Sequence, residues 1–274
     1  MNYENRVICF IDILGFKELV DATIDKDGSE NSDKLKLLLR ALNRIKQMVS
    51  SLDLDITESK RITQFSDSIV ISFQFNEESE VFMTLLSLQH LIIDLVGDGI
   101  LIRGGITSGK LIHTKDILVG PAMIEAYILE SQAANYPRII IDDSIFEIAA
   151  RYRRNGHRIS DELESIAKLV GKDSDGMHYV EYLKEVDTEM DEPECGYPIY
   201  LHDISKIIRK GISHRNPSVR VKYAWLKEKY NEIVIPLKET AKSFDFQEPE
   251  AAEAYAALPV FDSIDLGFLT PPAK

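Results

Sequence analysis

Two short acidic stretches of this sequence could hold divalent cations. Asp12 follows the apolar run VICFI, and Asp67 lies between the alternating segments KRITQF and SIVISF. A carboxylate at the end of a buried strand is costly to desolvate unless a cation meets it. Two such carboxylates could hold two divalent ions about 3.5–4 Å apart, which suits reactions at phosphate. The alternative is a helix cap at Asp12 and a turn residue at Asp67, and it is the more common reading for either aspartate alone.

The elements expected around the aspartates decide between these readings. We predict a strand at about residues 6–13, a long amphipathic helix, a hairpin with Asp67 at its tip, an apolar helix over 80–96 and the strand ILIRGGITSG. This order predicts an α+β fold with a ferredoxin-like βαββαβ core. The first strand then lies beside the hairpin, so Asp12 and Asp67 meet, and the pair favours a metal site.

Composition shifts divide the remaining chain. We predict a catalytic core over residues 1–150, the rest of that domain with a helical extension over 151–245, and an acidic, partly ordered tail over 246–274.

Bulk properties exclude several classes of function. The 274 residues carry a formal net charge of -13, so we expect no nucleic-acid partner, because such binding depends on neutralising phosphates. An anionic substrate would need local cations or metal ions. The two cysteines, Cys9 and Cys195, fit a reducing cytoplasm better than a disulfide framework. We expect no secretory signal and no membrane-spanning run, and therefore a cytoplasmic protein.

Four stretches, in the right order over about residues 5–145, resemble the motifs of class III nucleotide cyclases: FIDILGF, QFSDSIVISF, IRGGITSGKL and VGPAMIEAYILESQAANYPRIIID. Ser66 stands where glycine is usual. The resemblance implies two Mg²⁺ or Mn²⁺ ions per site and a homodimer with its sites between the subunits. The residues that it implies are Asp12, Asp67 and the Ile13 carbonyl as metal ligands, the backbone amides of Gly15, Phe16 and Lys17 on the phosphates, and Arg103 on the triphosphate. Lys110 is a further candidate cation on chemical grounds, although a solvated loop lysine is the more common reading.

The base-reading positions depart from the purine cyclases. Adenylyl cyclases have a lysine and an aspartate where this chain has Thr63 and Ile117, and the guanine-reading pair is absent too. Ile124 and Ile128 stand where those enzymes carry a transition-state asparagine and arginine. We identify Thr63, whose hydroxyl can donate and accept, and Arg61, on the same strand face, as candidates for the base pocket.

Chain length and motif series are most similar to the pyrimidine cyclases of the bacterial Pycsar anti-phage system. That resemblance implies conversion of UTP to 3′,5′-cyclic UMP and pyrophosphate, with the product activating a partner effector. The alternatives are a cytidylate cyclase making cyclic CMP and a non-catalytic nucleotide-binding homologue. Other classes find less support: the hairpin lacks the Gly-Gly-acidic-acidic motif of diguanylate-type cyclases, the six histidines have no zinc-ligand spacing, and no serine or cysteine nucleophile signature is present.

Overall fold

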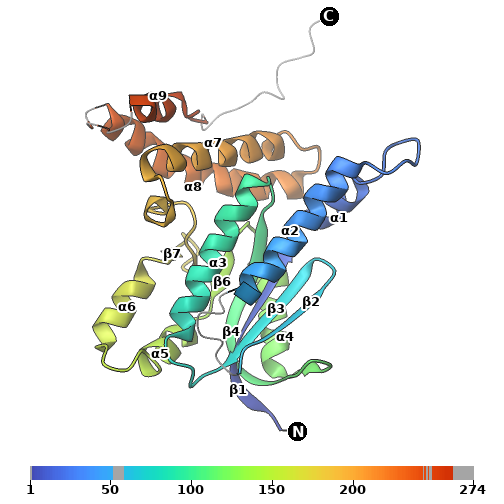
Figure 1. Cartoon of the computed structure of the whole chain (residues 1–274), viewed down its shortest axis with the longest axis vertical. Helices are drawn as coiled ribbons and strands as arrows, with labels where there is room; N and C mark the ends of the chain where they lie inside the picture. The colour runs from blue at the N-terminus through green and yellow to red at the C-terminus, as the bar shows by residue number, and fades with distance from the viewer. Residues whose placement is uncertain (1, 52–58, 243, 245, 247–248, 262–274) are drawn as a thin grey trace, which may run out of the picture. The chain divides into compact units, whose positions relative to one another are not determined.

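The strand that carries Asp12 lies at the centre of a mixed sheet (Figure 1). This computed structural model describes residues 2–51, 59–242, 244, 246 and 249–261. The chain divides into two compact units, residues 1–182 and 183–274. The elements of the first unit are β1 (Glu4–Ile13), α1 (Phe16–Asp21), α2 (Ser32–Ser51), β2 (Arg61–Phe65), β3 (Ser68–Gln74), α3 (Glu80–Gly97), β4 (Ile102–His113), β5 (Leu118–Val119), α4 (Pro121–Ile128), the π-helix η1 (Leu129–Ala133), β6 (Ile139–Ile141), α5 (Ser144–Arg151), α6 (Ile159–Ala167), β7 (Val170–Lys172) and β8 (His178–Val180).

The first strands of the sheet form the predicted core. β1 pairs antiparallel with β3 and with β4, and β3 pairs antiparallel with β2. The resulting order β2-β3-β1-β4 is that of a ferredoxin-like βαββαβ fold, so the predicted α+β class is confirmed. Beyond β4 the sheet continues through β6, which is parallel to β4, and then β8 and β7. β1 has this central place because nearly all its residues from Val7 to Ile13 are apolar and buried.

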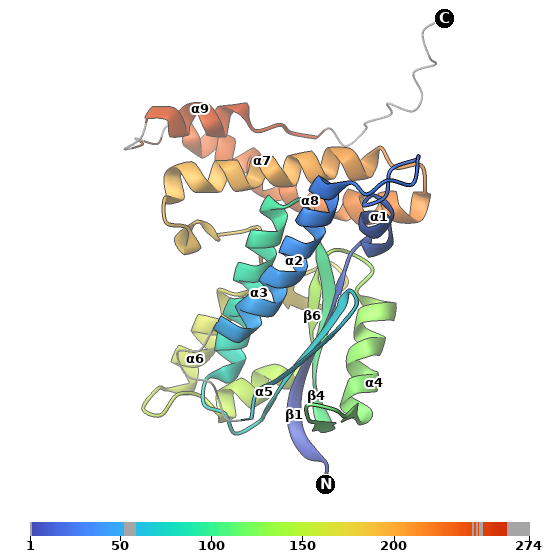
Figure 2. The ribbon, with the colours of Figure 1, turned by 45° about the vertical axis from the view of Figure 1, so that its right-hand side comes forward.

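Helices cover the two faces of the sheet differently. α2 and α3 lie on one face and α4 on the other (Figures 1 and 2). The α4 face approaches β4 closely at Gly105, where an added Cβ would stand 2.5 Å from the Leu129 Cβ. This glycine therefore lets the turn that joins α4 to η1 rest on the strand backbone.

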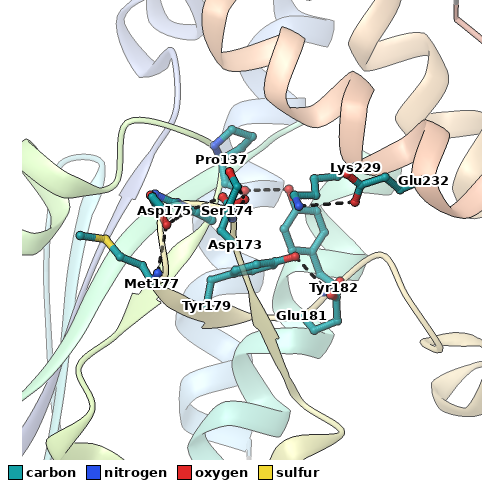
Figure 3. A network of polar contacts seen from close by, with 11 residues as sticks. Pro137, Asp173, Ser174, Asp175, Met177, Tyr179, Glu181, Tyr182, Lys229 and Glu232 are labelled. Carbon is teal, nitrogen blue, oxygen red and sulfur yellow. Dashed lines mark hydrogen bonds and ion pairs between the residues drawn. The ribbon is translucent and has the colours of Figure 1, made fainter.

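The far edge of the sheet is tied down by polar contacts around the β7–β8 turn (Figure 3). Arg138, 1% exposed, pairs with Asp173 and Asp175. The Tyr182 hydroxyl donates to the Pro137 carbonyl at 2.7 Å. These contacts hold the last strands of the unit to the segment before β6.

The second unit is helical among its described residues. It comprises the short 3₁₀ helix η2 (Asp187–Glu189), α7 (Pro193–Ile212), α8 (Pro217–Ala241) and α9 (Pro249–Ala257). Gly211 of α7 lies directly against the Tyr223 ring of α8, where a Cβ would approach to 1.9 Å. α9 falls within the tail predicted to be partly ordered, whereas residues 262–274 lie outside the described residues.

One described helix, α3, is long and apolar enough to cross a membrane by length and composition. Its residues Leu85, Leu88, Leu91 and Leu95 are at most 2% exposed within the first unit. Because a buried core helix passes the same test, this helix is weak evidence for a membrane span.

Candidate active site

Asp12 lies one residue before the end of β1, on the face of the sheet that also carries α4. It stands opposite Ser68 of β3 and Arg103 of β4 in the strand register. The Ser68 hydroxyl donates to Asp12 Oδ1 at 3.3 Å, and Arg103 Nη2 lies 3.5 Å from Asp12 Oδ2. Residues on both neighbouring strands therefore fix the direction of this carboxylate.

Asp67 reaches the same place from the tip of the β2–β3 hairpin. The two-residue connection holds Ser66 in the left-handed region with φ 56°, a conformation that costs most residues free energy and that glycine adopts freely. Burial and then the Asp67 carboxylate raise the pKa of Asp12, while Arg103 acts in the opposite direction. The predicted meeting of Asp12 and Asp67 is thus what the sheet topology produces.

The donor set of this pair suits a hard divalent cation. Two carboxylates and the adjacent backbone carbonyl of Ile13 are the oxygen ligands that Mg²⁺ and Mn²⁺ prefer. Burial is the main cause of the raised pKa of Asp12 and repulsion from the Asp67 carboxylate is the next, and a bound cation would relieve that repulsion. Among the described residues no group of three or more His, Cys, Asp or Glu side chains could hold a metal, so the carbonyl and further oxygens would have to complete the coordination.

Arg103 has a second partner that the sequence did not indicate. Its Nη2 lies 2.6 Å from Oε1 of Glu130, a side chain only 4% exposed on η1. A buried carboxylate requires a cation close by, so Glu130 holds Arg103 next to Asp12. The signal in the sequence was the single acidic residue of the apolar stretch AYILESQA, a weak sign without the fold. π-helical turns such as η1 occur frequently at functional sites.

The two groups of predicted phosphate-binding residues are placed differently. The amides of Gly15, Phe16 and Lys17 lie at the start of α1, directly after β1, with Gly15 at φ 76°. The Lys17 side chain is 83% exposed and pairs with Asp21 at 2.7 Å. Lys110 is seven residues from Arg103 on β4, which puts it on the opposite face and about 23 Å along the strand. Within one chain Lys110 therefore does not join the Asp12 site.

Thr63 belongs to a hydrogen-bonded chain on the α4 face. Its Oγ1 lies 2.9 Å from Nε2 of His113, and the other ring nitrogen, Nδ1, lies 2.8 Å from Ser72 Oγ. Arg6, 2% exposed, donates from Nε to the same Ser72 hydroxyl at 2.9 Å. Histidine spacing in the sequence gave no hint of this role, because its partners lie 41 and 50 residues away.

The other candidate base-reading residue, Arg61, lies two residues before Thr63 on β2 and donates to the carbonyl of Lys60 at 2.7 Å. Arg61 also lines a polar cavity of about 740 Å³, which Arg6 and His113 of the hydrogen-bonded chain line as well. The remaining lining residues are Glu4, Ser59, Gln74, Asn76, Glu77, Thr114 and Lys115.

His113 should make the stability of the protein pH-dependent. Burial first, and then the charges of Arg6 and Arg61, lower its pKa from 6.5 to about 4. The unfolded chain therefore binds more protons between these values, and the contribution present above pH 6.5 is lost as the pH falls through 4. We expect on the order of 2 kcal/mol less unfolding free energy at pH 4 than at pH 7 from this residue. Denaturant unfolding of wild type and His113→Gln at both pH values measures it, and equal pH dependence in the two proteins would contradict it.

An exposed apolar surface lies beside the site. We call it the α4 patch; it comprises Ile124, Tyr127 and Ile128, which their spacing puts on one face of α4. Ile124 is 61% and Tyr127 52% exposed. The Tyr127 ring packs edge-on against Phe10, with centroids 5.8 Å apart, and so joins the patch to β1. Ile117, Ile124 and Ile128 are thus surface residues in the single chain.

Comparison with known proteins gives structural similarities only. No family model matches the sequence, and no curated protein matches it. Among solved structures, the chain is similar to the adenylyl cyclase CyaB from P. aeruginosa, with 16% identity and a TM-score of 0.42, over 65% of this chain and 94% of that one.

Two further structures are similar to a comparable degree. A bacterial light-regulated adenylyl cyclase has 16% identity and a TM-score of 0.37, over 55% of this chain and 82% of that one. A class III adenylyl cyclase-like ATP-binding protein from Pseudomonas aeruginosa has 13% identity and a TM-score of 0.39, over 74% of this chain and 44% of that one. Similarities at this level do not by themselves assign a family or an activity to the chain.

Proposed function

We propose that this chain is a metal-dependent nucleotide cyclase of class III type that converts UTP to 3′,5′-cyclic UMP and pyrophosphate. The observation that carries the proposal is the meeting of Asp12, Asp67 and Arg103 at one end of the central strands. A pair of carboxylates with an adjacent arginine suits a triphosphate whose charge is neutralised by both cations and guanidinium. The resemblance of the motifs around these residues to class III cyclases supports the same chemistry.

In this reaction the 3′-oxygen of the ribose bonds to the α-phosphorus while the bond to the pyrophosphate oxygen breaks. The 3′-hydroxyl proton leaves to solvent, and pyrophosphate departs with the bonding electron pair. Asp12, Asp67 and the Ile13 carbonyl would hold two Mg²⁺ or Mn²⁺ ions, which supply Lewis-acid stabilisation when bound. Arg103 would orient the triphosphate, and the amides of Gly15, Phe16 and Lys17 would receive its outer oxygens.

The choice of a pyrimidine rests on the base-reading positions. Thr63 and Ile117 replace the lysine and aspartate of adenylyl cyclases, and Ile117 is 45% exposed with no polar group to offer. A site that hydrogen-bonds a purine edge needs such groups. The similarity to Pycsar cyclases motivates UTP as the substrate, a role in anti-phage defence, and an effector reached through the product.

Turnover with each nucleoside triphosphate tests this function. The protein is incubated with ATP, GTP, CTP or UTP and Mn²⁺, and the products are identified by mass spectrometry. We expect cyclic UMP as the main product. Cyclic AMP or cyclic GMP would contradict the pyrimidine reading, and cyclic CMP would contradict only the choice between pyrimidines. Nucleotide binding without product would favour the non-catalytic alternative.

The α4 patch supports a homodimer. Exposed apolar residues gathered on one face favour association with a second copy, because burial removes them from water. Ile124→Glu should therefore weaken self-association at least about tenfold, since it places a charge in the apolar interface. Sedimentation equilibrium measures this, with Ile159→Glu as a control: Ile159 is 51% exposed on α6, outside the patch. An unchanged dimer in the Ile124 variant would show that the patch is not the interface.

A further inference from the structure

The hydrogen bonds around His113 fix which hydrogens are available to a ligand. Arg6 Nε–H can only donate, so Ser72 Oγ accepts it at 2.9 Å. The Ser72 hydroxyl proton then has Nδ1 of His113 as its nearest acceptor, at 2.8 Å. His113 is neutral at pH 7, because burial lowers its pKa to about 4. A neutral imidazole that accepts at Nδ1 carries its only N–H at Nε2.

This tautomer determines the role of Thr63. Nε2–H donates to Thr63 Oγ1 across 2.9 Å, which occupies one lone pair of the hydroxyl. The Thr63 hydroxyl hydrogen is then the group left to be donated outward. When a ligand covers Thr63, this hydrogen must find an acceptor, since a buried donor left unpaired is costly.

Thr63 also has an aromatic neighbour suited to a flat heterocycle. Phe65 is two residues further along β2 and hence on the same face, and it is 44% exposed. Its ring lies 6.3 Å from Phe10, centroid to centroid, so it is supported from below by the core. An exposed, supported aromatic ring beside a donor of fixed direction is a suitable surface for stacking a nucleobase.

We propose that Thr63 reads the nucleobase as a hydrogen-bond donor whose direction is set by the Arg6–Ser72–His113 chain, so that the site selects a ring carbonyl over a ring amino group. The inference rests on the proposed function and deepens it. Uracil presents a carbonyl at position 4, where cytosine presents an amino group. With cytosine, the Thr63 hydroxyl hydrogen would stay unpaired, so UTP is preferred over CTP. Arg6, Ser72 and His113 are positioning residues in this scheme.

Equilibrium binding of UTP and CTP in the presence of Mg²⁺, by calorimetry, tests the selection without requiring turnover. Wild type should bind UTP about ten- to a hundredfold more tightly than CTP, the range expected for one unpaired buried donor. Thr63→Val, which keeps the shape and removes the hydroxyl, should bring the ratio close to one. Thr63→Ser, which keeps the donor, should preserve it. Equal ratios in the valine and serine variants, or no preference in wild type, would overturn the proposal.

The role of the Arg6–Ser72–His113 chain can be tested separately, through the tautomer of His113. Nitrogen-15 spectroscopy of the His113 ring in the nucleotide-free protein should show a protonated Nε2 and a bare Nδ1 at neutral pH. Ser72→Ala removes the hydroxyl that holds His113 in that tautomer. It should therefore lower the preference for UTP over CTP although Thr63 is intact. A protonated Nδ1 in wild type would overturn the positioning role of Arg6, Ser72 and His113. An unchanged preference for UTP over CTP in a folded Ser72→Ala protein would overturn it too. Absence of cyclic product with the binding ratios as expected would refute the proposed function alone.

Discussion

Replacing either Asp12 or Asp67 with alanine should abolish cyclic-nucleotide formation while leaving the fold intact. Each substitution removes one of the two carboxylates that meet at the end of β1. Metal ions supply several kcal/mol of charge stabilisation in such reactions, so we expect activity to fall by about three orders of magnitude or more. Product formation from UTP with Mn²⁺ is the measurement.

The two variants should differ in stability, which provides an internal check. In metal-free buffer, Asp67→Ala removes repulsion from Asp12 and leaves the 3.5 Å contact of Asp12 with Arg103, so its melting temperature should rise. Asp12→Ala loses that contact as well, so its melting temperature should rise less. Glu164→Ala, which removes an exposed carboxylate on α6, is the charge-matched control and should keep its activity. Near-normal turnover in either aspartate variant would rule that residue out as a metal ligand.

Arg103→Ala should reduce kcat/KM for UTP about ten- to a hundredfold, the equivalent of one charge-assisted hydrogen bond to phosphate. Lys110→Ala should have a much smaller effect, because Lys110 lies on the opposite face of β4. Steady-state kinetics on the two variants compare them directly. Equal and negligible losses would remove Arg103 from the site.

The effect of Arg103→Ala on activity has to be separated from its effect on stability, because Arg103 is paired with Glu130. Removing the arginine alone leaves a carboxylate that is 4% exposed without its 2.6 Å partner, and breaking a buried pair costs about 3–5 kcal/mol. The double variant Arg103→Ala/Glu130→Gln removes that penalty. Its melting temperature should recover while its activity stays low. Recovery of both would show that the single variant failed through instability.

Local signals in the sequence were sufficient for the core. The alternation in SIVISF, the apolar run before Asp12 and the hairpin spacing at Ser66-Asp67 depend on neighbouring residues, and they predicted β1, β2 and β3 with the right order. Once that order is known, the antiparallel register brings Asp12 and Asp67 together without further information. This part of the site follows from topology.

Other parts of the fold and of the site depend on contacts between residues that are far apart in the sequence. Glu130 and Arg103 are 27 residues apart and meet because Gly105 lets η1 rest on β4. Residues 151–195 are rich in polar residues and show no clear periodicity, yet they contain α6 and the β7–β8 hairpin. Each of those strands has only three residues, too short for an alternating pattern, and their position depends on Arg138. No periodicity in the sequence encodes such pairings.

β2 is an edge strand of the sheet, and this position has a consequence for how such a protein can diversify. Asp12 is flanked by Ile11 and Ile13, each 1% exposed, so most changes there disturb the core. The strand that carries Thr63 is largely exposed, and substitutions on it should change the unfolding free energy by only about 0.5 kcal/mol. Mutational drift can therefore retune ligand preference along β2 while the buried residues of β1 on either side of Asp12 stay under strong stability constraint. The architecture separates robustness from evolvability within a single sheet.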